Sequence, residues 1–111
     1  MPLPERRSLL SLDPEANRFR FFEVELCAVK GGAEIRRRWG RVGAAGRRGV
    51  QRFESVKEAR AAWDGLLKHR GRRGYVEAGA AELEGARRLL AWHLAARRAP
   101  RQAAFPAALG F

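Results

Sequence analysis

The chain has little cysteine and little histidine, and these shortages exclude several kinds of chemistry. A single cysteine, Cys27, cannot form an internal disulfide framework. The two histidines, His69 and His93, lie far apart in the sequence, and no group of His and Cys has the spacing of a metal site. No pair of carboxylates is placed for acid–base catalysis. We therefore expect no metal, no cofactor and no enzymatic activity.

Long apolar runs are also missing. No stretch approaches the roughly 20 apolar residues of a membrane span, and residues 1–7 lack the apolar core of a signal peptide. With its lone cysteine, the chain is expected to be a soluble, cytoplasmic protein with no membrane partner. Its 111 residues, 46% of them hydrophobic, can bury one modest core. We expect one domain with an appendage.

Negative charge is scarce. Against 12 acidic residues stand 23 basic ones, which gives a formal net charge of +11, and only three of the basic residues are lysines. Such a charge favours a polyanionic partner. A compositional bias towards Arg, Ala and Gly from a GC-rich genome is the alternative explanation for part of the excess.

The densest cluster of functional residue types is the run Arg-Arg-Arg-Trp-Gly-Arg-Val-Gly at positions 36–43. A turn with Gly46, Arg47, Arg48 and Gly49 follows it. Arginine offers planar, bidentate donors to phosphate, and an exposed indole offers a surface for a sugar or a base. The glycine spacing is not the dinucleotide fingerprint, and a strand rather than a helix is expected to follow. The run therefore indicates nucleic acid rather than a nucleotide cofactor.

Alternation of apolar and polar residues predicts antiparallel strands. In residues 18–29, Phe22, Val24 and Leu26 alternate with glutamates. Phe19 and Phe21 fall on the opposite phase, which indicates either a bulge or a strand end covered on both faces. The other predicted strands are residues 8–12, residues 33–42 after a Gly31-Gly32 hairpin turn, and residues 50–54 after a glycine-rich, non-strand segment at 43–49.

The third of these strands carries the Trp-Gly-Arg triplet. By alternation, Ile35, Arg37, Trp39 and Arg41 share one face. Burying two unpaired guanidinium groups would be costly, so we expect Trp39 to be at least partly exposed. The alternative is an ordinary core tryptophan whose arginine neighbours extend outwards to solvent.

Two helices are predicted. Ser55 and Glu58 form a capping-box pattern at the start of the first helix. An apolar stripe follows and runs to about His69; it includes Trp63, which we assign to the core. Gly71 is expected to end this helix. Residues 80–98 form the second helix, whose apolar side packs on the sheet or, alternatively, forms a homodimer or partner interface. The tail at 100–111 either docks or frays.

Four segments, taken in order, resemble the WGR domain. They are Asn17 to Phe22, then Trp39-Gly40-Arg41-Val42-Gly43, then Phe53-Glu54-Ser55 leading into a helix, and finally Arg73-Gly74-Tyr75. The resemblance covers residues 8–76 and leaves 77–111 as a C-terminal helix and tail. It implies an α+β fold, an antiparallel sheet packed against one helix. Small bacterial WGR proteins have a similar layout.

The resemblance also implies a function. In eukaryotic poly(ADP-ribose) polymerases this module binds DNA near a strand break, and its tryptophan rests against the sugar close to a 5′ end. Carried over, Trp39 is the stacking residue, Arg41 contacts DNA or a neighbouring domain, and Asn17 is a further DNA contact. Ala44 and Arg47 stand where the family often has Thr and Gln, so two neutral hydrogen-bonding groups are lost and one phosphate-seeking group is gained.

Together these observations predict a noncatalytic nucleic-acid-binding module with little base specificity. DNA, including strand ends or breaks, is the expected ligand, and RNA is an alternative. A protein-interaction adaptor that uses the Trp-Gly-Arg face or the C-terminal helix is the rival hypothesis. The predicted nucleic-acid-binding residues are Asn17, Arg36, Arg37, Arg38, Trp39, Gly40, Arg41, Arg47, Arg48, Arg70, Arg72 and Arg73.

Overall fold

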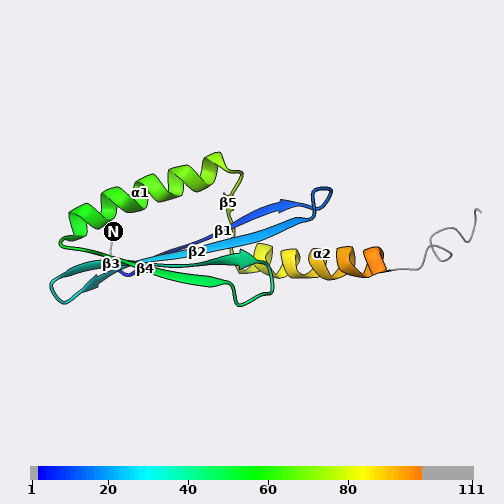
Figure 1. Ribbon diagram of the computed structural model, residues 1–111, viewed down its shortest axis with the longest axis horizontal. Helices are drawn as coiled ribbons and strands as arrows, with labels where there is room; N and C mark the ends of the chain where they lie inside the picture. The colour runs from blue at the N-terminus through cyan, green and yellow to red at the C-terminus, as the bar shows by residue number, and fades with distance from the viewer. Residues whose placement is uncertain (1–2, 99–111) are drawn as a thin grey trace, which may run out of the picture.

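The computed structural model describes residues 3–98, which form a five-stranded antiparallel sheet and two helices (Figure 1). The strand order is β4-β3-β2-β1-β5. The strands are β1 (Glu5–Asp13), β2 (Arg18–Val29), β3 (Gly32–Arg41), β4 (Arg47–Phe53) and β5 (Val76–Glu77), and the helices are α1 (Val56–Arg72) and α2 (Ala80–Arg98). The predicted α+β class is confirmed. Within residues 3–98 no helix is long and apolar enough to cross a membrane.

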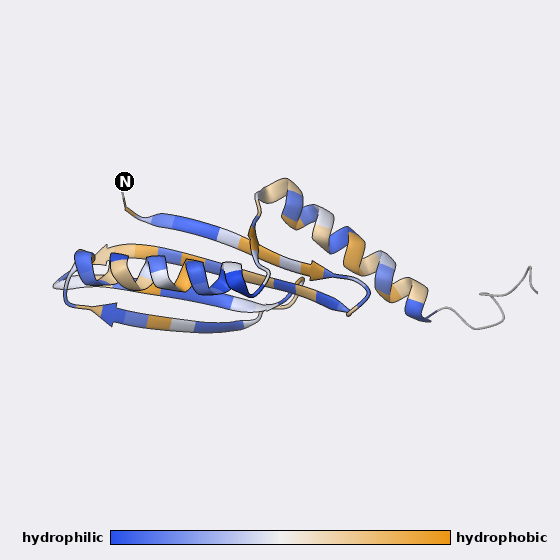
Figure 2. Cartoon of the chain, turned by 90° about the horizontal axis from the view of Figure 1, so that it is seen from above, coloured by the Kyte–Doolittle hydropathy of each residue, from blue (hydrophilic) through white to orange (hydrophobic). Residues whose placement is uncertain are grey.

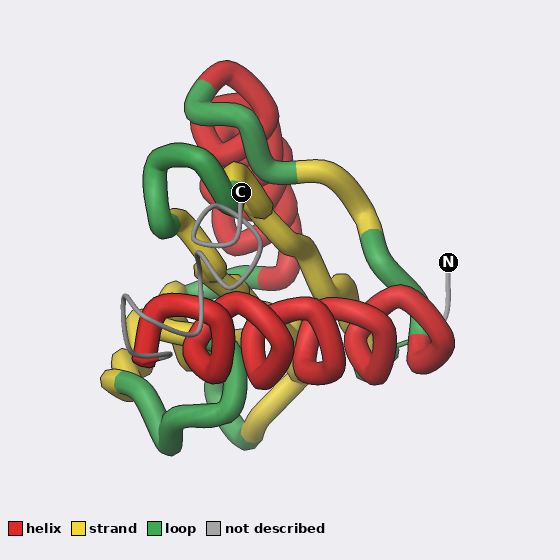
Figure 3. Tube along the Cα trace, turned by 90° about the vertical axis from the view of Figure 1, so that its right-hand side faces the viewer, coloured by secondary structure: helices red, strands yellow, loops and turns green. Residues whose placement is uncertain are grey.

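The molecule has three layers. Seen from its end, α1 lies on one side of the sheet and α2 on the other, and the segment with β5 joins them (Figure 3). The two helices are offset along the sheet, so that α2 lies towards the end that carries the β1–β2 turn (Figure 1). Orange and blue residues alternate along the strands in Figure 2, as expected for a sheet whose faces have different surroundings.

The register of the sheet follows from one tight hairpin. Val29 pairs with Gly32, and Gly31, with φ of +83°, takes the left-handed conformation that the turn requires. From there the β2–β3 pairing runs without interruption to Arg20 opposite Arg41, and it places Phe22 opposite Trp39. Since this pairing and that of β1 with β2 are both continuous, no bulge separates Phe19 and Phe21 from Phe22.

Two apolar clusters fill the spaces between the layers. The cluster under α1 contains Leu9, Phe22, Val24, Leu26, Ala33, Ile35, Ala59 and Trp63. The cluster under α2 contains Leu10, Phe19, Phe21, Val42, Ala86 and Leu90. At the start of β2 only the face that carries Phe19 and Phe21 is covered, by α2, whereas Arg18 and Arg20 on the other face are exposed, and from Phe22 onwards α1 covers that other face. The opposite phase of Phe19 and Phe21 therefore reflects a change in which face is covered, and the prediction that α2 packs on the sheet is confirmed. Trp63, 2% exposed, is a core residue as predicted.

Several element boundaries differ from the predictions. The Glu58 backbone N–H donates to the Ser55 hydroxyl, as the capping pattern predicted, but Gly71 does not end α1. The helix continues to Arg72, because Gly74, with φ of +87°, supplies the left-handed turn three residues later. Strand β1 is longer than the predicted 8–12. The predicted fate of the tail at 100–111 lies outside the described residues.

The prediction of a non-strand segment over 43–49 is wrong for its last three residues. Strand β4 begins at Arg47, which pairs with Trp39, and Gly49 lies opposite Arg37. A glycine is accommodated here because the indole of Trp39 occupies the space above it. A Cβ at position 49 would lie 3.4 Å from the nearest indole carbon. The glycine therefore supports side-chain packing rather than a loop.

Candidate nucleic-acid interface

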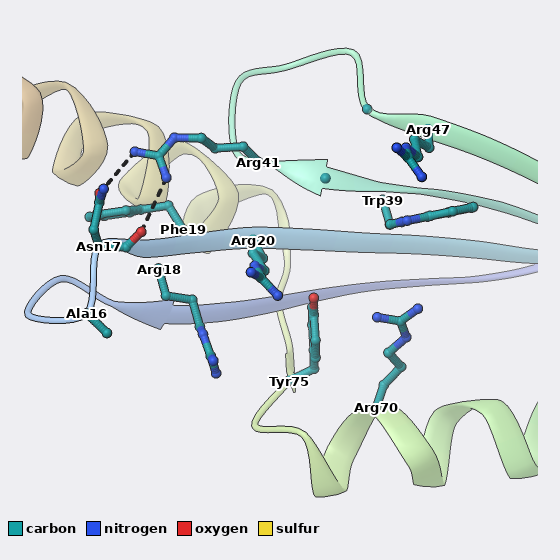
Figure 4. Close-up of a pocket in the computed structure, with 12 residues that line it drawn as sticks. Ala16, Asn17, Arg18, Phe19, Arg20, Trp39, Arg41, Arg47, Arg70 and Tyr75 are labelled. Carbon is teal, nitrogen blue, oxygen red and sulfur yellow. Dashed lines mark hydrogen bonds between the residues drawn. The ribbon is translucent and has the colours of Figure 1, made fainter.

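Beyond the C-terminal end of α1, the face of the sheet that this helix covers becomes open, and a hollow of about 640 Å³ lies there (Figure 4). We call it the basic groove. Its lining comes from the β1–β2 turn, the ends of β2 and β3, the start of β4 and the end of α1. The lining residues are Ala16, Asn17, Arg18, Phe19, Arg20, Trp39, Gly40, Arg41, Gly46, Arg47, Arg70 and Tyr75. No carboxylate is among them.

Trp39 forms one wall of the basic groove. It is partly buried against the α1 cluster, and its indole lies across Gly49 of β4. The guanidinium carbon of Arg37 is 5.7 Å from the centre of the indole ring. The predicted partial exposure of Trp39 is confirmed, and these contacts hold its ring in one orientation. A ring that is fixed before binding loses little freedom when a ligand stacks on it.

The turn after the Trp-Gly-Arg triplet is shaped by close backbone approach. Gly46 has φ of +75°, and a Cβ there would collide with the carbonyl of Trp39 and the ring of Phe21. A Cβ on Gly40 would lie 3.0 Å from the Cα of Gly46. The glycine of the triplet therefore allows the turn to fold back over the strand, beside the indole.

Two arginines of β2 point into the basic groove. Arg18 and Arg20 are in phase with Phe22 and so share its face of the sheet. Arg20 stands directly opposite Arg41, and like charges in cross-strand positions are destabilising. No carboxylate of residues 3–98 lies within 4 Å of a guanidinium nitrogen of Arg18, Arg20, Arg41, Arg47 or Arg70.

Arg70 and Tyr75 form the opposite wall, at the end of α1. The guanidinium carbon of Arg70 lies 4.1 Å from the ring centre of Phe22 and 5.3 Å from that of Tyr75. A guanidinium stacked in this way keeps its N–H groups at the edge, available to an acceptor. A second hollow of about 250 Å³ shares Arg18, Arg20, Arg70 and Tyr75 and adds Ser11 and Arg73. The positive surface thus continues past the groove.

Arg41 lies at the end of the groove formed by the β1–β2 turn. Its Nη1 donates to the backbone carbonyl of Asn17 at 3.3 Å, and its Nη2 donates to Asn17 Oδ1 at 3.1 Å (Figure 4). Asn17 itself has φ of +52°, a conformation that asparagine tolerates better than most residues. The structure therefore brings these two predicted residues together at one end of the groove.

Three other predicted arginines lie on the opposite face of the sheet. Arg36 is 3.0 Å from a carboxylate oxygen of Glu34, and Arg38 is 3.0 Å from one of Glu23. Arg48, which pairs with Arg38, lines a separate hollow with it. Charges on this face are partly compensated, in contrast to the basic groove. Arg72, also predicted, is exposed in the last turn of α1 and does not line the groove.

Sequence reasoning missed Arg18, Arg20 and Tyr75 as site residues, although the first two could have been found. With the hairpin turn at Gly31, counting back along both strands places Arg20 opposite Arg41 and Phe22 opposite Trp39. Tyr75 follows α1, and no periodic pattern in the sequence around it indicates that it is a site residue. Only the three-dimensional path of the helix brings it to the groove.

The assembled surface offers guanidinium groups that lack a carboxylate partner within residues 3–98, beside the rings of Trp39 and Tyr75. Guanidinium groups match phosphate oxygens, and ring faces accept sugars and bases. No pair of groups in the groove has the arrangement of a nucleophile and its base. The chemistry of the groove is recognition of an anion attached to a flat or apolar ring.

Comparisons with known proteins identify a family and a similar fold. A family model described as the WGR domain matches residues 6–82. A crystal structure of a protein from Bacteroides fragilis is 24% identical, with a TM-score of 0.57, and the match covers 71% of this chain and 21% of that one. This likeness supports the fold alone, and the chain spans about a fifth of the length of that protein. No curated protein matches the sequence.

Proposed function

The chain belongs to the WGR domain family, and from this premise we propose that it is a noncatalytic module that binds nucleic acid, DNA in particular, in the basic groove. One observation carries the proposal. Five arginines that have no carboxylate partner among residues 3–98 surround a pre-oriented tryptophan and a tyrosine. Like charges gathered in this way lower stability unless an anion joins them.

The roles of the residues follow from their positions. The indole of Trp39 stacks on a sugar or base at one wall, and the guanidinium groups of Arg20 and Arg70 contact phosphates across the groove. Arg47, which pairs with Trp39 on the neighbouring strand, takes the next phosphate along. Phosphates and ring faces are common to every sequence, so binding shows little base preference. The proposal includes a more specific element, namely that this chain prefers DNA strand ends to continuous duplex.

The test measures the affinity of a fluorescently labelled duplex by anisotropy at several salt concentrations. Trp39→Ala should weaken binding by about 1 to 3 kcal/mol, as expected for the loss of one stacked base. Arg20→Gln should lower the salt slope by about one unit if it removes one phosphate contact. A duplex with a free 5′-phosphorylated end is compared with a closed dumbbell to test end preference.

Arg36→Gln is the matched control for Arg20→Gln. Both variants lose one positive charge, but Arg36 lies on the opposite face and is paired with Glu34. A clearly larger loss of affinity and salt slope for Arg20→Gln places the ligand in the basic groove. Equal losses from both variants would mean that only the net charge matters, and the groove would then have no special role.

A protein-interaction adaptor is the second candidate. It is favoured by Trp92, which is 68% exposed on α2, and by an apolar hollow of about 430 Å³ between α2 and the β1–β5 edge, where Val76 is also exposed. Large exposed apolar side chains mark interaction surfaces. A wild-type protein that binds DNA weakly and without dependence on Trp39 would favour this candidate.

A further inference from the structure

Helix α2, on the opposite side of the sheet, contacts the end of the basic groove that the β1–β2 turn forms. His93 Nε2 lies 3.1 Å from Asn17 Oδ1, and the His93 ring is 5.0 Å from the ring of Phe19, centre to centre. Asn17 Oδ1 is the same atom that accepts the hydrogen bond from Arg41 Nη2. One amide oxygen thus joins a residue of α2 to the arginine of the Trp-Gly-Arg triplet.

The donors and acceptors of this contact are fixed by chemistry. A guanidinium group can only donate, so the Asn17 atom that faces Arg41 must be the oxygen of the amide. Because that oxygen can only accept, His93 Nε2 must carry a proton and donate to it. The Asn17 side chain is therefore held from both sides, and its φ of +52° sets the direction in which it leaves the turn.

The ring of Phe19 forms the floor of this arrangement. It is fully buried beneath α2, and the Arg41 guanidinium carbon lies 5.6 Å from its centre. His93 and Arg41 thus meet at both Asn17 and Phe19. The family match ends at residue 82, so His93 lies outside the matched part of the chain.

We infer that His93 is a positioning residue of the basic groove. Through Asn17 it holds Arg41 in one orientation before any ligand is bound. Two N–H groups of Arg41 are occupied by Asn17, and the remaining ones are available to an anion at this end of the groove. A pre-oriented side chain loses less conformational entropy on binding. The effect on affinity rests on the proposed function, whereas the effect on Arg41 order does not.

The first measurement uses the free protein. Relaxation of the Arg41 Nε–H group by ¹⁵N NMR should show an ordered side chain in the wild type and in His93→Gln, whose amide nitrogen can replace the Nε2 donor. In His93→Leu, which keeps apolar packing on Phe19 but has no donor, the Arg41 group should become more mobile. An equally ordered Arg41 in His93→Leu would overturn the inference.

The second measurement is a double-mutant cycle with the labelled duplex. His93→Leu should weaken binding about three- to tenfold, in line with the loss of one hydrogen bond that orients a charged group, and His93→Gln should restore most of the affinity. In an Arg41→Gln background, His93→Leu should have no further effect. The same loss in both backgrounds would show that His93 acts independently of Arg41 and would overturn the inference.

The two measurements also separate this inference from the proposed function. A wild-type protein that binds no nucleic acid would refute the proposed function, while the order of Arg41 in His93→Leu would still decide whether His93 positions it. Thermal unfolding of both His93 variants provides the control for folding. If the Leu variant is unstable, the Gln variant still tests the inference, because a mobile Arg41 in a variant that keeps the donor would overturn it.

Discussion

Replacing Trp63 with alanine provides the most informative test of the fold. Trp63 lies on the buried side of α1, is 2% exposed and packs in the same cluster as Phe22, Leu26 and Ile35. These neighbours belong to paired strands that cannot close around a cavity without breaking the sheet. The substitution should therefore have the full effect of a buried aromatic truncation, about 3 to 5 kcal/mol of unfolding free energy.

Urea unfolding, followed by circular dichroism because the substitution removes a fluorophore, gives the free energy directly. Trp92→Ala is the matched control, since it makes the same change on the other helix at a residue that is 68% exposed. It should alter stability by no more than about 0.5 kcal/mol. A loss below about 1.5 kcal/mol for Trp63→Ala, or equal losses from both variants, would refute the assignment of α1 to the core.

Three further substitutions test other parts of the structure. Gly46→Ala should cost roughly 2 kcal/mol in urea unfolding and should change the Trp39 fluorescence, because its Cβ would collide with the Trp39 carbonyl; a neutral effect would contradict the close approach. Leu90→Ala should cost about 2 to 4 kcal/mol if α2 is docked on the sheet, and an unchanged urea midpoint would show that it is not. The hydrogen bond from Arg60 lowers the pKa of Glu5 below its ordinary value of 4.5. Glu5 therefore stabilises the fold above that value, and its contribution is lost as the pH falls through the folded-state pKa. Glu5→Gln should make the urea midpoint less dependent on pH below about 4.5, and an unchanged pH profile would argue against this ion pair.

Much of the fold could be predicted because the local patterns agree with the final packing. The alternation in β2 and the tight turn at Gly31 determine the register, and the apolar stripe around Trp63 determines the side of α1 that is buried. The start of β4 was missed because glycines normally weaken a strand. Here the indole of Trp39 on the neighbouring strand β3 packs against Gly49, and no local sequence pattern reveals this contact.

The site was predictable only in part. Trp39, Arg41, Arg47 and Arg70 were all predicted as site residues from the sequence, and the structure brings them to one groove. Alternation along β3 assigns Arg36 and Arg38 to the face of the sheet opposite Trp39. The prediction nevertheless included them, because the arginines of this run were treated as one cluster. The contribution of α2 could not be foreseen, because His93 reaches Asn17 across 76 positions of the chain.

The central claim is that nucleic acid binds in the basic groove beside Trp39. The three tryptophans lie in three different surroundings, so their indole N–H signals in a ¹⁵N NMR titration with a 5′-phosphorylated duplex report on three parts of the molecule. We expect the Trp39 signal to shift progressively with added duplex, while the signals of Trp63 and Trp92 stay in place. A titration in which Trp92 shifts and Trp39 does not would contradict the account.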